Sequence, residues 1–491
     1  MKYGSLIKGA TIIDGQNQPP FVADVAIVDE NIVAIGQLDP SNADSIIDAN
    51  GLVLSPGFID VHTHDDTNVI RMPECVPKIS QGVTTTIVGN CGISASPAVL
   101  TVAPPDPMNL LGEQQDFKYP NFASYVDAVN QAQPAVNVAA LVGHTTLRNN
   151  VMDDLYRTAT PEEIREMKVQ LRQALSEGAL GLSTGLAYAS AKSCDEHEVL
   201  ALTQELTRAN AIYTTHLRTE FEGILDAMDE AFRVGMAAKV PVVISHLKCA
   251  GAGNWGRTTD VLKKIDHARQ SLDVGCDCYP YTASSSTLDL NQVTDEYPIF
   301  ITWSVPHPEL AGQLLSDIAC DLGLNLLDAA KVLKPAGAVY HNMDAQDVER
   351  VLKYPLTMIG SDGLPNDPHP HPRLWGAFPR VLGYYCRERK LFPLTTAIHK
   401  MTGLSAQRFA LVKRGEIKIG NFADLVLFDP DEIIDTASFR EPKQAAKGIH
   451  TVWVNGKISY QQSTGVQGRH GRFLRRKNTE LASSKLMEIN S

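Results

Sequence analysis

Short apolar runs, most of them rich in Val, Ile and Thr, recur along the middle of the chain. They alternate with segments in which apolar residues return every three or four positions. A run of the first kind predicts a buried strand, and the second spacing predicts an amphipathic helix that covers a sheet. Segments 161–178 and 195–210 also begin with acidic residues, which is typical of a first helical turn. The predicted strands are residues 58–64, 84–92, 136–144, 178–186, 212–218, 241–248, 274–281 and 356–363.

Eight strands that alternate with helices predict an α/β fold, a closed TIM-like (β/α)8 barrel of parallel strands over residues 57–411. Two intervals are too long for a single crossover helix. Residues 93–135 follow the second strand, and about 75 residues separate the seventh strand from the eighth. We therefore expect an inserted subdomain or lid at about 286–345.

The two ends of the chain have a different character from the middle. Residues 1–56 and 412–467 contain short apolar runs separated by Asn, Asp and Gly, which predict strands joined by turns. We expect both ends to meet in one small β-sandwich domain. Residues 468–491 concentrate Arg and Lys before a polar end, a composition that predicts a solvated tail.

Composition narrows the range of partners. The chain has 491 residues, 44% of them hydrophobic and 20% charged, so it can bury a large core. The net charge of -12 disfavours nucleic acid and anionic membranes as partners, and a small-molecule ligand is expected. The first residues lack the apolar core of a signal peptide, and the eight Cys are too sparse for a disulfide scaffold. We expect a cytoplasmic protein; the sequence is compatible with a monomer but does not fix the oligomeric state.

Chemically versatile residues stand at the carboxyl ends of the predicted strands, which meet at one mouth in a barrel. His62 and His64 are two apart in a strand, so their side chains point to the same side. Taken singly, Cys91 could be a buried thiol and His246 a core histidine. These separate explanations do not account for the whole set. Histidine is rare, at 14 of the 491 residues, yet it recurs at the ends of several predicted strands. The candidate site residues are His62, His64, Cys91, His144, His216, His246 and Asp362.

Thiolate and imidazole donors favour zinc over magnesium or calcium. Cys91, His216 and His246 predict one tight zinc site with an open fourth position, as catalytic zinc sites have. His62 and His64 would hold a second, weaker ion, which Cys91 could bridge to the first.

A bound zinc ion polarises a carbonyl and lowers the pKa of water from about 15.7 to about 7, so that hydroxide can attack an amide. Asp362 could take the proton from that water and pass it to the departing nitrogen. For His144 two roles stay open: it could act on the substrate directly, by polarising the carbonyl or orienting the substrate, or it could support another residue of the site.

Longer segments around these residues resemble the amidohydrolase superfamily and, within it, the N-acyl-D-amino-acid deacylases, or D-aminoacylases. The resemblance runs in order over nearly the whole chain, and the cysteine on the second strand is specific to that branch. The segments that carry it are PGFIDVHTH (56–64), GVTTTIVGNCG (82–92), LVGHTTLR (141–148), GALGLSTGLAY (178–188), THLR (215–218), SHLK (245–248), DCYPYTASSSTL (277–288) and GSDGLPNDPHPHPRLWGAFPRVLG (360–383).

The resemblance implies zinc-dependent hydrolysis of N-acyl-D-amino acids to a carboxylic acid and a free D-amino acid. It assigns the metal ligands and the acid/base Asp362 as above. It also implies that Lys248, Tyr279 and Arg373 hold the α-carboxylate of the substrate. An Arg fork and a Lys suit a carboxylate, although Arg373 could also form a surface ion pair.

Two positions depart from the pattern of the family. Relatives that prefer D-glutamate derivatives carry an Arg after the seventh strand, whereas no Arg occurs here between Arg269 and Arg350. We therefore expect a preference for neutral or apolar D-side chains. His470 stands where relatives tend to have Pro, which concerns packing rather than chemistry.

Three alternative functions make different demands on the sequence. Hydantoinase-like or dihydroorotase-like enzymes, which hydrolyse cyclic amides, bridge their metals with a carboxylated Lys on the fourth strand, and residues 178–186 contain no Lys. A related amidase, for example one acting on acyl-dipeptides, would use the same carboxylate clamp and stays open, as does the preferred acyl group. A non-catalytic relative would be expected to have lost ligands, and this chain has kept all of them.

Overall fold

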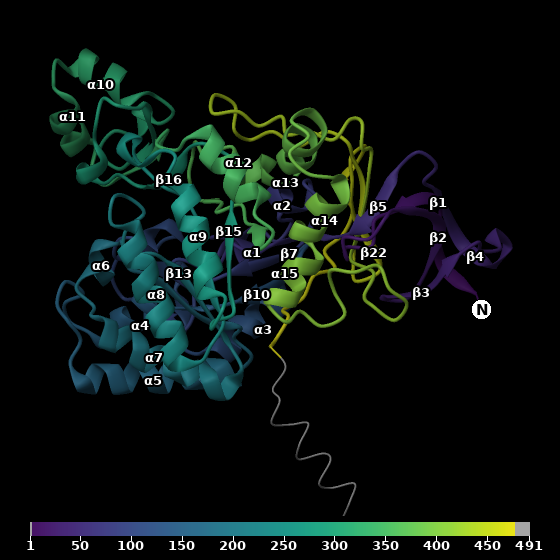
Figure 1. Ribbon diagram of the computed structural model, residues 1–491, viewed down its shortest axis with the longest axis horizontal. Helices are drawn as coiled ribbons and strands as arrows, with labels where there is room; N and C mark the ends of the chain where they lie inside the picture. Colours follow the sequence, from purple (N-terminus) through teal and green to yellow (C-terminus); the bar gives the residue numbers. More distant parts are fainter. Residues whose placement is uncertain (1, 477–491) are drawn as a thin grey trace, which may run out of the picture.

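The computed structural model describes residues 2–476 and contains the predicted (β/α)8 barrel (Figure 1). The barrel strands that pair do so in parallel, and an isolated parallel bridge between Thr63 and Gly363 joins the chain just after the first and last strands. The barrel strands are β6 (Phe58–Asp60), β7 (Val83–Val88), β10 (Asn137–Ala140) continued by β11 (Val142–Gly143), β12 (Gly181–Gly185), β13 (Ile212–His216), β14 (Val242–Ile244), β15 (Val274–Cys278) and β19 (Thr357–Ile359).

Helices surround these strands. The larger ones are α3 (Phe122–Ala132), α4 (His144–Val151), α5 (Pro161–Ser176), α7 (Glu196–Ala209), α8 (Ile224–Ala238), α9 (Thr258–Ala268), α12 (Ala345–Lys353), α13 (Arg373–Arg380), η7 (Val381–Glu388) and α14 (Leu394–Met401). Short helices are α1 (Asn68–Arg71), α2 (Val76–Ile79), α6 (Ala189–Lys192) and α15 (Gly403–Arg408). Among residues 2–476, no helix combines the length and the apolar character that a membrane crossing needs.

Helix α5 shows how the local sequence sets such an element. The hydroxyl of Thr160 accepts a hydrogen bond from the backbone N–H of Glu163, whose carboxylate accepts one from the N–H of Thr160. This reciprocal capping satisfies two donors that the first helical turn would leave free, and Pro161 fits the first position because it has no N–H to satisfy. Ile164, Met167 and Leu171, spaced by three and four residues, are buried against the barrel.

The inside of the barrel is filled by apolar side chains that alternate along the strands with those facing the helices. Residues from α15 and the segment after it close this core beside the strand starts, where Leu180 and Ile212 lie. The opposite, carboxyl end is therefore where polar groups can gather. The interior cluster comprises Ile59, Val61, Ile87, Ala139, Leu141, Leu180, Ile212, Val243, Met358, Leu404, Ala406, Phe409 and Leu411.

The ring closes between its first and last strands, β6 and β19. Just beyond them, the backbone N–H of Asp362 donates to the carbonyl of His62 at 2.7 Å. The buried carboxylate of Asp60 accepts the N–H of Ser361 at 2.8 Å, its hydroxyl at 2.6 Å and the ammonium of Lys78 at 2.9 Å. One ion pair with its hydrogen bonds therefore pins both strand ends that carry candidate site residues.

Both ends of the chain build one β domain, as predicted, and it lies to the right of the barrel in Figure 1. Hydrogen bonds join its nine strands into a single sheet, in which β5 pairs with β20 and so connects the two ends of the chain. Trp453 lies in the apolar core of this domain. The strands are β1 (Tyr3–Ile12), β2 (Phe21–Val28), β3 (Asn31–Gly36), β4 (Ala43–Asp48), β5 (Val53–Pro56), β20 (Leu425–Phe428), β21 (Ile449–Val454), β22 (Lys457–Gln461) and β23 (Gly465–Val466).

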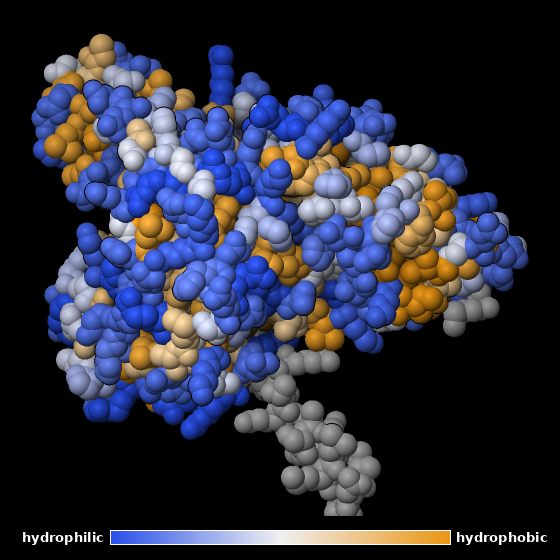
Figure 2. Space-filling view, viewed as in Figure 1, coloured by the Kyte–Doolittle hydropathy of each residue, from blue (hydrophilic) through white to orange (hydrophobic). Residues whose placement is uncertain are grey.

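The long segment before the eighth strand forms a body with its own apolar core. It consists of a three-stranded antiparallel sheet, β16 (Ser284–Thr287), β17 (Ile299–Ser304) and β18 (Ala336–Tyr340), with α10 (Leu315–Leu322) and α11 (Leu326–Leu333). The two helices project from the barrel at the upper left of Figure 1, and Figure 2 shows apolar side chains on their surface. The other long segment, after the second strand, contains the short pair β8 (Ala98–Val99) and β9 (Lys118–Tyr119) before α3.

The prediction of a solvated tail is wrong for residues 468–476. Arg472 and Leu474 exchange backbone hydrogen bonds with Val138 of β10, and the ring of Phe473 packs 5.6 Å from that of Phe122. An aromatic residue among the Arg residues lets this segment bury apolar surface, which charge counting overlooked. Residues 477–491 lie outside the described part of the chain.

Replacing Lys78 with Met should strongly destabilise the protein. The substitution leaves the carboxylate of Asp60 buried without its cation, and removing one partner of a buried ion pair costs about 3–5 kcal/mol. Lys263→Met is the matched control, because Lys263 forms an exposed ion pair of the kind worth about 0–1 kcal/mol. Urea unfolding measures both free energies, and similar losses in the two variants would contradict the assignment.

Candidate metal centre

Four side chains from different strands meet at the carboxyl end of the barrel. The ligand atoms of His62, Cys91, His246 and Asp362 all lie within 4.8 Å of one another, and all four residues are buried. Cys91 is in the middle: its Sγ is 3.1 Å from Nε2 of His62 and 3.3 Å from Nε2 of His246. The oxygen Oδ1 of Asp362 lies 3.5 Å from Nε2 of His62.

The other two predicted histidine ligands flank this group. Nε2 of His64 is 3.2 Å from Oδ1 of Asp362, and the ring of His216 packs edge-on against the ring of His246 at 4.5 Å. The structure therefore brings all five predicted ligands and Asp362 to one place.

His144 does not join them. Its Nε2 is 2.7 Å from Oε1 of Glu198, which also pairs with Arg148, and all three residues are fully buried. Within residues 2–476, no hydrogen bond links His144 to the predicted ligands, and its Nδ1 has no hydrogen-bond partner. Of the two roles left open by the sequence, these contacts favour support of the surrounding structure.

The backbone turns sharply at three of the converging strand ends. Cys91, His246 and Asp362 have φ values of +53°, +35° and +49°, in the left-handed region that residues with a side chain rarely adopt. The chain also packs tightly there, because a side chain at Gly185 would collide with the backbone oxygen of Cys91. Such conformations persist only where the surroundings enforce them, and they cluster at functional sites.

Two carboxylates stand behind the histidines. The Asp277 carboxylate lies 3.2 Å from Nδ1 of His62 and accepts the backbone N–H of His246 at 2.9 Å. Oε1 of Glu220 lies 2.9 Å from Nδ1 of His246. Since each Nε2 faces Cys91, these acids can fix the ring orientation of the two histidines. Sequence reasoning missed both, although an acid in a buried strand and an acid four residues after His216 were available signals.

Neighbouring positive charges favour the anionic forms of two of the donors, Cys91 and Asp362. Burial raises the pKa of the Cys91 thiol, but the imidazoles of His62 and His246 outweigh it and hold the pKa well below its usual value. Burial also opposes ionisation of Asp362, but Arg373 and His246 hold the pKa of its carboxyl well below the usual range. Both shifts favour the anionic forms in which a thiol and a carboxyl bind metals.

The donor set of imidazole nitrogen, thiolate sulfur and carboxylate oxygen fits zinc. His216, Glu220 and His246 form a second group of potential metal ligands, but the ammonium of Lys248 lies beside it. Nζ of Lys248 lies 2.6 Å from Oε1 of Glu220 and 2.9 Å from Nδ1 of His246, so an ammonium already supplies the positive charge there. The donor atoms that face one another without such a cation are those of His62, Cys91, His246 and Asp362, with His64 and His216 at their sides.

The three residues expected to bind a carboxylate lie together beside this centre. The guanidinium of Arg373 stacks 4.5 Å above the ring of Tyr279, and the ammonium of Lys248 lies 5.8 Å from the same ring. Nη1 of Arg373 forms an ion pair with Oδ2 of Asp362 at 2.9 Å, but among the described residues neither Nη1 nor Nε, both buried, has a hydrogen-bond partner. The backbone N–H of Arg373 donates to Nδ1 of His371, a positioning contact that the sequence did not reveal.

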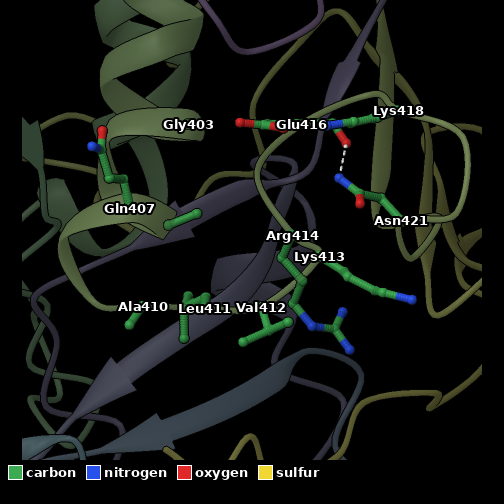
Figure 3. Close-up of a pocket in the computed structure, with 11 residues that line it drawn as sticks. Gly403, Gln407, Ala410, Leu411, Val412, Lys413, Arg414, Glu416, Lys418 and Asn421 are labelled. Atoms are coloured by element: carbon green, nitrogen blue, oxygen red, sulfur yellow. Dashed lines mark hydrogen bonds between the residues drawn. The ribbon is translucent and has the colours of Figure 1, made fainter. Parts of the chain in front are cut away.

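A cavity of about 420 Å³ lies elsewhere, between α15 and the segment up to Asn421 (Figure 3). It borders the closed amino end of the barrel, opposite the converging histidines, and contains none of the predicted site residues. The guanidinium of Arg414 in its lining is held by Asp424 and Asn455, so it serves the junction with the β domain.

Comparison with known proteins places the chain among metal-dependent amide hydrolases. The family model described as "Amidohydrolase family" matches residues 45–460. The chain is 47% identical over 471 residues to the D-aminoacylase of Alcaligenes xylosoxydans xylosoxydans, covering 96% of this chain and 97% of that protein. It is also 47% identical over 471 residues to the N-acyl-D-aspartate deacylase of the same organism, covering 96% and 94%. The fold matches, with a TM-score of 0.94, the crystal structure of N-acyl-D-glutamate deacylase from Bordetella bronchiseptica complexed with zinc and a phosphonate inhibitor; the sequences are 42% identical, and the match covers 97% of this chain and 100% of that chain.

Replacing His216 or His246 with Ala should remove the tightly held zinc, because these residues and Cys91 are expected to form the tight position. The same change at His62 or His64 should leave most of the zinc bound while still impairing turnover. Zinc per chain after dialysis, measured by elemental analysis, tests this ranking. His267→Ala, at an exposed position of α9, is the control. Equal zinc loss from all four variants would show that the two positions are ranked wrongly.

Proposed function

This chain belongs to the amidohydrolase family, as its motifs predicted, and we propose that it is a zinc-dependent deacylase that hydrolyses the amide bond of N-acyl-D-amino acids. The products are a carboxylic acid and a free D-amino acid. One observation carries the proposal. A buried ligand set centred on Cys91 lies beside a Lys248–Arg373 pair suited to a carboxylate, on a chain 47% identical over 96% of its length to a D-aminoacylase.

We assign the tight zinc to Cys91, His216 and His246 and a second, weaker ion to His62 and His64, with the carboxylate of Asp362 beside them. When bound, zinc supplies a Lewis acid that polarises the amide carbonyl and lowers the pKa of water. The protein fixes the donors beforehand, since Asp277 and Glu220 restrain the rings of His62 and His246. Pre-positioned donors need no rearrangement during the reaction.

Asp362 is the group placed to move the proton. Its Oδ1 faces His64 and His62 at 3.2 and 3.5 Å, and its Oδ2 is held by Arg373 at 2.9 Å. The arginine keeps the carboxylate ionised, so that it can accept a proton from the attacking water and return it to the leaving nitrogen.

Lys248, Tyr279 and Arg373 are proposed to hold the α-carboxylate. Lys248 and Arg373 are both positive and lie near the same aromatic ring, and the unpaired Nε of Arg373 is a buried donor that needs an acceptor. Because Arg373 also contacts Asp362, the residue that binds the substrate and the residue that moves the proton are fixed relative to each other.

Within this function we propose a preference for neutral or apolar D-side chains. The inserted body offers no Arg, since none occurs between Arg269 and Arg350. Where β16 approaches the barrel, the nearby acid is Asp106, whose carboxylate lies 3.4 Å from the hydroxyl of Thr287. Overall sequence identity does not show whether neutral or acidic D-side chains are preferred, because the chain is equally similar to a D-aminoacylase and to an N-acyl-D-aspartate deacylase.

N-acetyl-D-leucine and N-acetyl-D-methionine should be hydrolysed with a higher kcat/KM than N-acetyl-D-glutamate or N-acetyl-D-aspartate. An acidic side chain would lose water without gaining a cationic partner. Initial rates on the four substrates, together with N-acetyl-L-leucine to test stereospecificity, measure this preference. A dominant activity on D-glutamate or D-aspartate derivatives would rule it out.

Asp362→Asn should lower kcat by about 10²–10⁴-fold, the usual contribution of a positioned acid or base, while the tight zinc stays bound. The amide cannot accept the proton but keeps the size of the side chain. Asp226→Asn, at an exposed position of α8, is the matched control and should behave like the wild type. Unchanged activity of Asp362→Asn would remove this residue from the mechanism.

A further inference from the structure

Glu220 connects the metal centre with the carboxylate clamp. It lies in the loop between β13 and α8 and is only 8% exposed. Its Oε1 is shared between Nζ of Lys248 at 2.6 Å and Nδ1 of His246 at 2.9 Å, and its Oε2 is 4.0 Å from Nε2 of His216. A single buried carboxylate therefore contacts one expected ligand and the clamp lysine, and lies next to a second ligand.

The atoms Oε1 of Glu220, Nδ1 of His246 and Nζ of Lys248 form a triangle, and the position of one hydrogen decides how it is bonded. If neutral His246 carries its hydrogen on Nε2, its Nδ1 accepts an N–H from Lys248. If the hydrogen is on Nδ1, it needs an acceptor. Glu220 is the only member of the triangle that can provide one, because an ammonium has donors alone.

Metal binding selects between these two states. Nε2 of His246 faces Cys91 at 3.3 Å, so a metal held by both residues would use the lone pair of Nε2 and leave the hydrogen on Nδ1. That hydrogen then goes to Glu220, and Lys248 loses Nδ1 as an acceptor. Its other partners are Glu220 and the backbone oxygen of His246 at 3.2 Å, so one of its three N–H groups becomes available.

We propose that Glu220 is a positioning residue that holds His246 in its metal-binding tautomer and thereby releases one N–H of Lys248 for the carboxylate of the substrate. The first part concerns only the metal centre. The second part rests on the proposed function, since it requires a substrate with a carboxylate. Metal binding and carboxylate binding then favour each other through this side chain, as any such coupling must act in both directions.

Zinc affinity of the full-length protein tests the first part. The metal is removed with a chelator, and the zinc dissociation constant is then measured by competition with a chromophoric chelator. Glu220→Leu should weaken zinc binding by about 10–100-fold, the usual effect of losing the acceptor behind a metal-binding histidine. Glu220→Gln should recover part of this loss, because its amide oxygen can still accept the Nδ1 hydrogen. Glu222→Leu, two residues further along and exposed, is the control and should match the wild type.

Lys248→Met separates this role from simple support of the structure. If the Glu220–Lys248 ion pair only stabilised the fold, loss of either partner would weaken zinc binding. Tautomer control predicts opposite signs, because Lys248 stabilises the state of His246 that cannot bind the metal. Lys248→Met should therefore have a lower zinc dissociation constant than the wild type. This measurement also decides the matter if Glu220→Leu fails to fold.

The inference is overturned if Glu220→Leu binds zinc like the wild type or if Glu220→Leu and Glu220→Gln lose equal amounts of zinc affinity. It is also overturned if Lys248→Met binds zinc more weakly than the wild type. The second part predicts that Lys248→Met, saturated with zinc, raises the KM for N-acetyl-D-leucine more than it lowers kcat. An unchanged KM overturns that part alone. If the expected zinc affinities are found but no N-acyl-D-amino acid is hydrolysed, the proposed function fails and the role of Glu220 at the metal centre stands.

Discussion

The site depends first on how the barrel closes between β6 and β19. The carboxylate of Asp60, buried and paired with Lys78, binds both the backbone and the hydroxyl of Ser361. His62 and His64 come two and four residues after Asp60, and Asp362 follows directly after Ser361. A shift of one residue between these strands would move the histidines away from the aspartate, because neighbouring strand residues point to opposite sides. A buried ion pair thus sets the register on which the chemistry relies.

Once the strands are in register, the site must still bury several negatively charged side chains. Cys91, Asp362, Asp277 and Glu220 bring negative charge into a region that is almost free of solvent. Such charges are costly to bury unless they are paired, and here each has a neighbour: histidine rings around Cys91, Arg373 beside Asp362, Lys248 beside Glu220 and His62 beside Asp277. The resulting network fixes side chains that would otherwise move. A cation among the donors would compensate the negative charge that Cys91 and Asp362 share.

The carboxylate clamp and the metal centre are parts of the same network. Arg373 contacts Asp362, and Lys248 shares Glu220 with His246. In the proposed function, these contacts would connect recognition of the substrate with the residues assigned to the chemistry. The inserted body adds the remaining wall, since Arg373 also donates to the backbone oxygen of Ser285 in β16. The insertion therefore helps to position Arg373.

The sequence by itself determined the barrel, the domain made from both ends and the residues at the strand ends. These depend on local periodicity and on side-chain chemistry, and both can be read residue by residue. Tertiary structure alone decided the support: Asp277 behind His62, Glu220 between His246 and Lys248, and His144 turned towards Glu198. It also decided that Phe473 packs against the barrel instead of lying in a solvated tail. Such contacts join residues tens to hundreds of positions apart, and they depend on strand register and on backbone turns such as the left-handed one at Cys91, which no local pattern encodes.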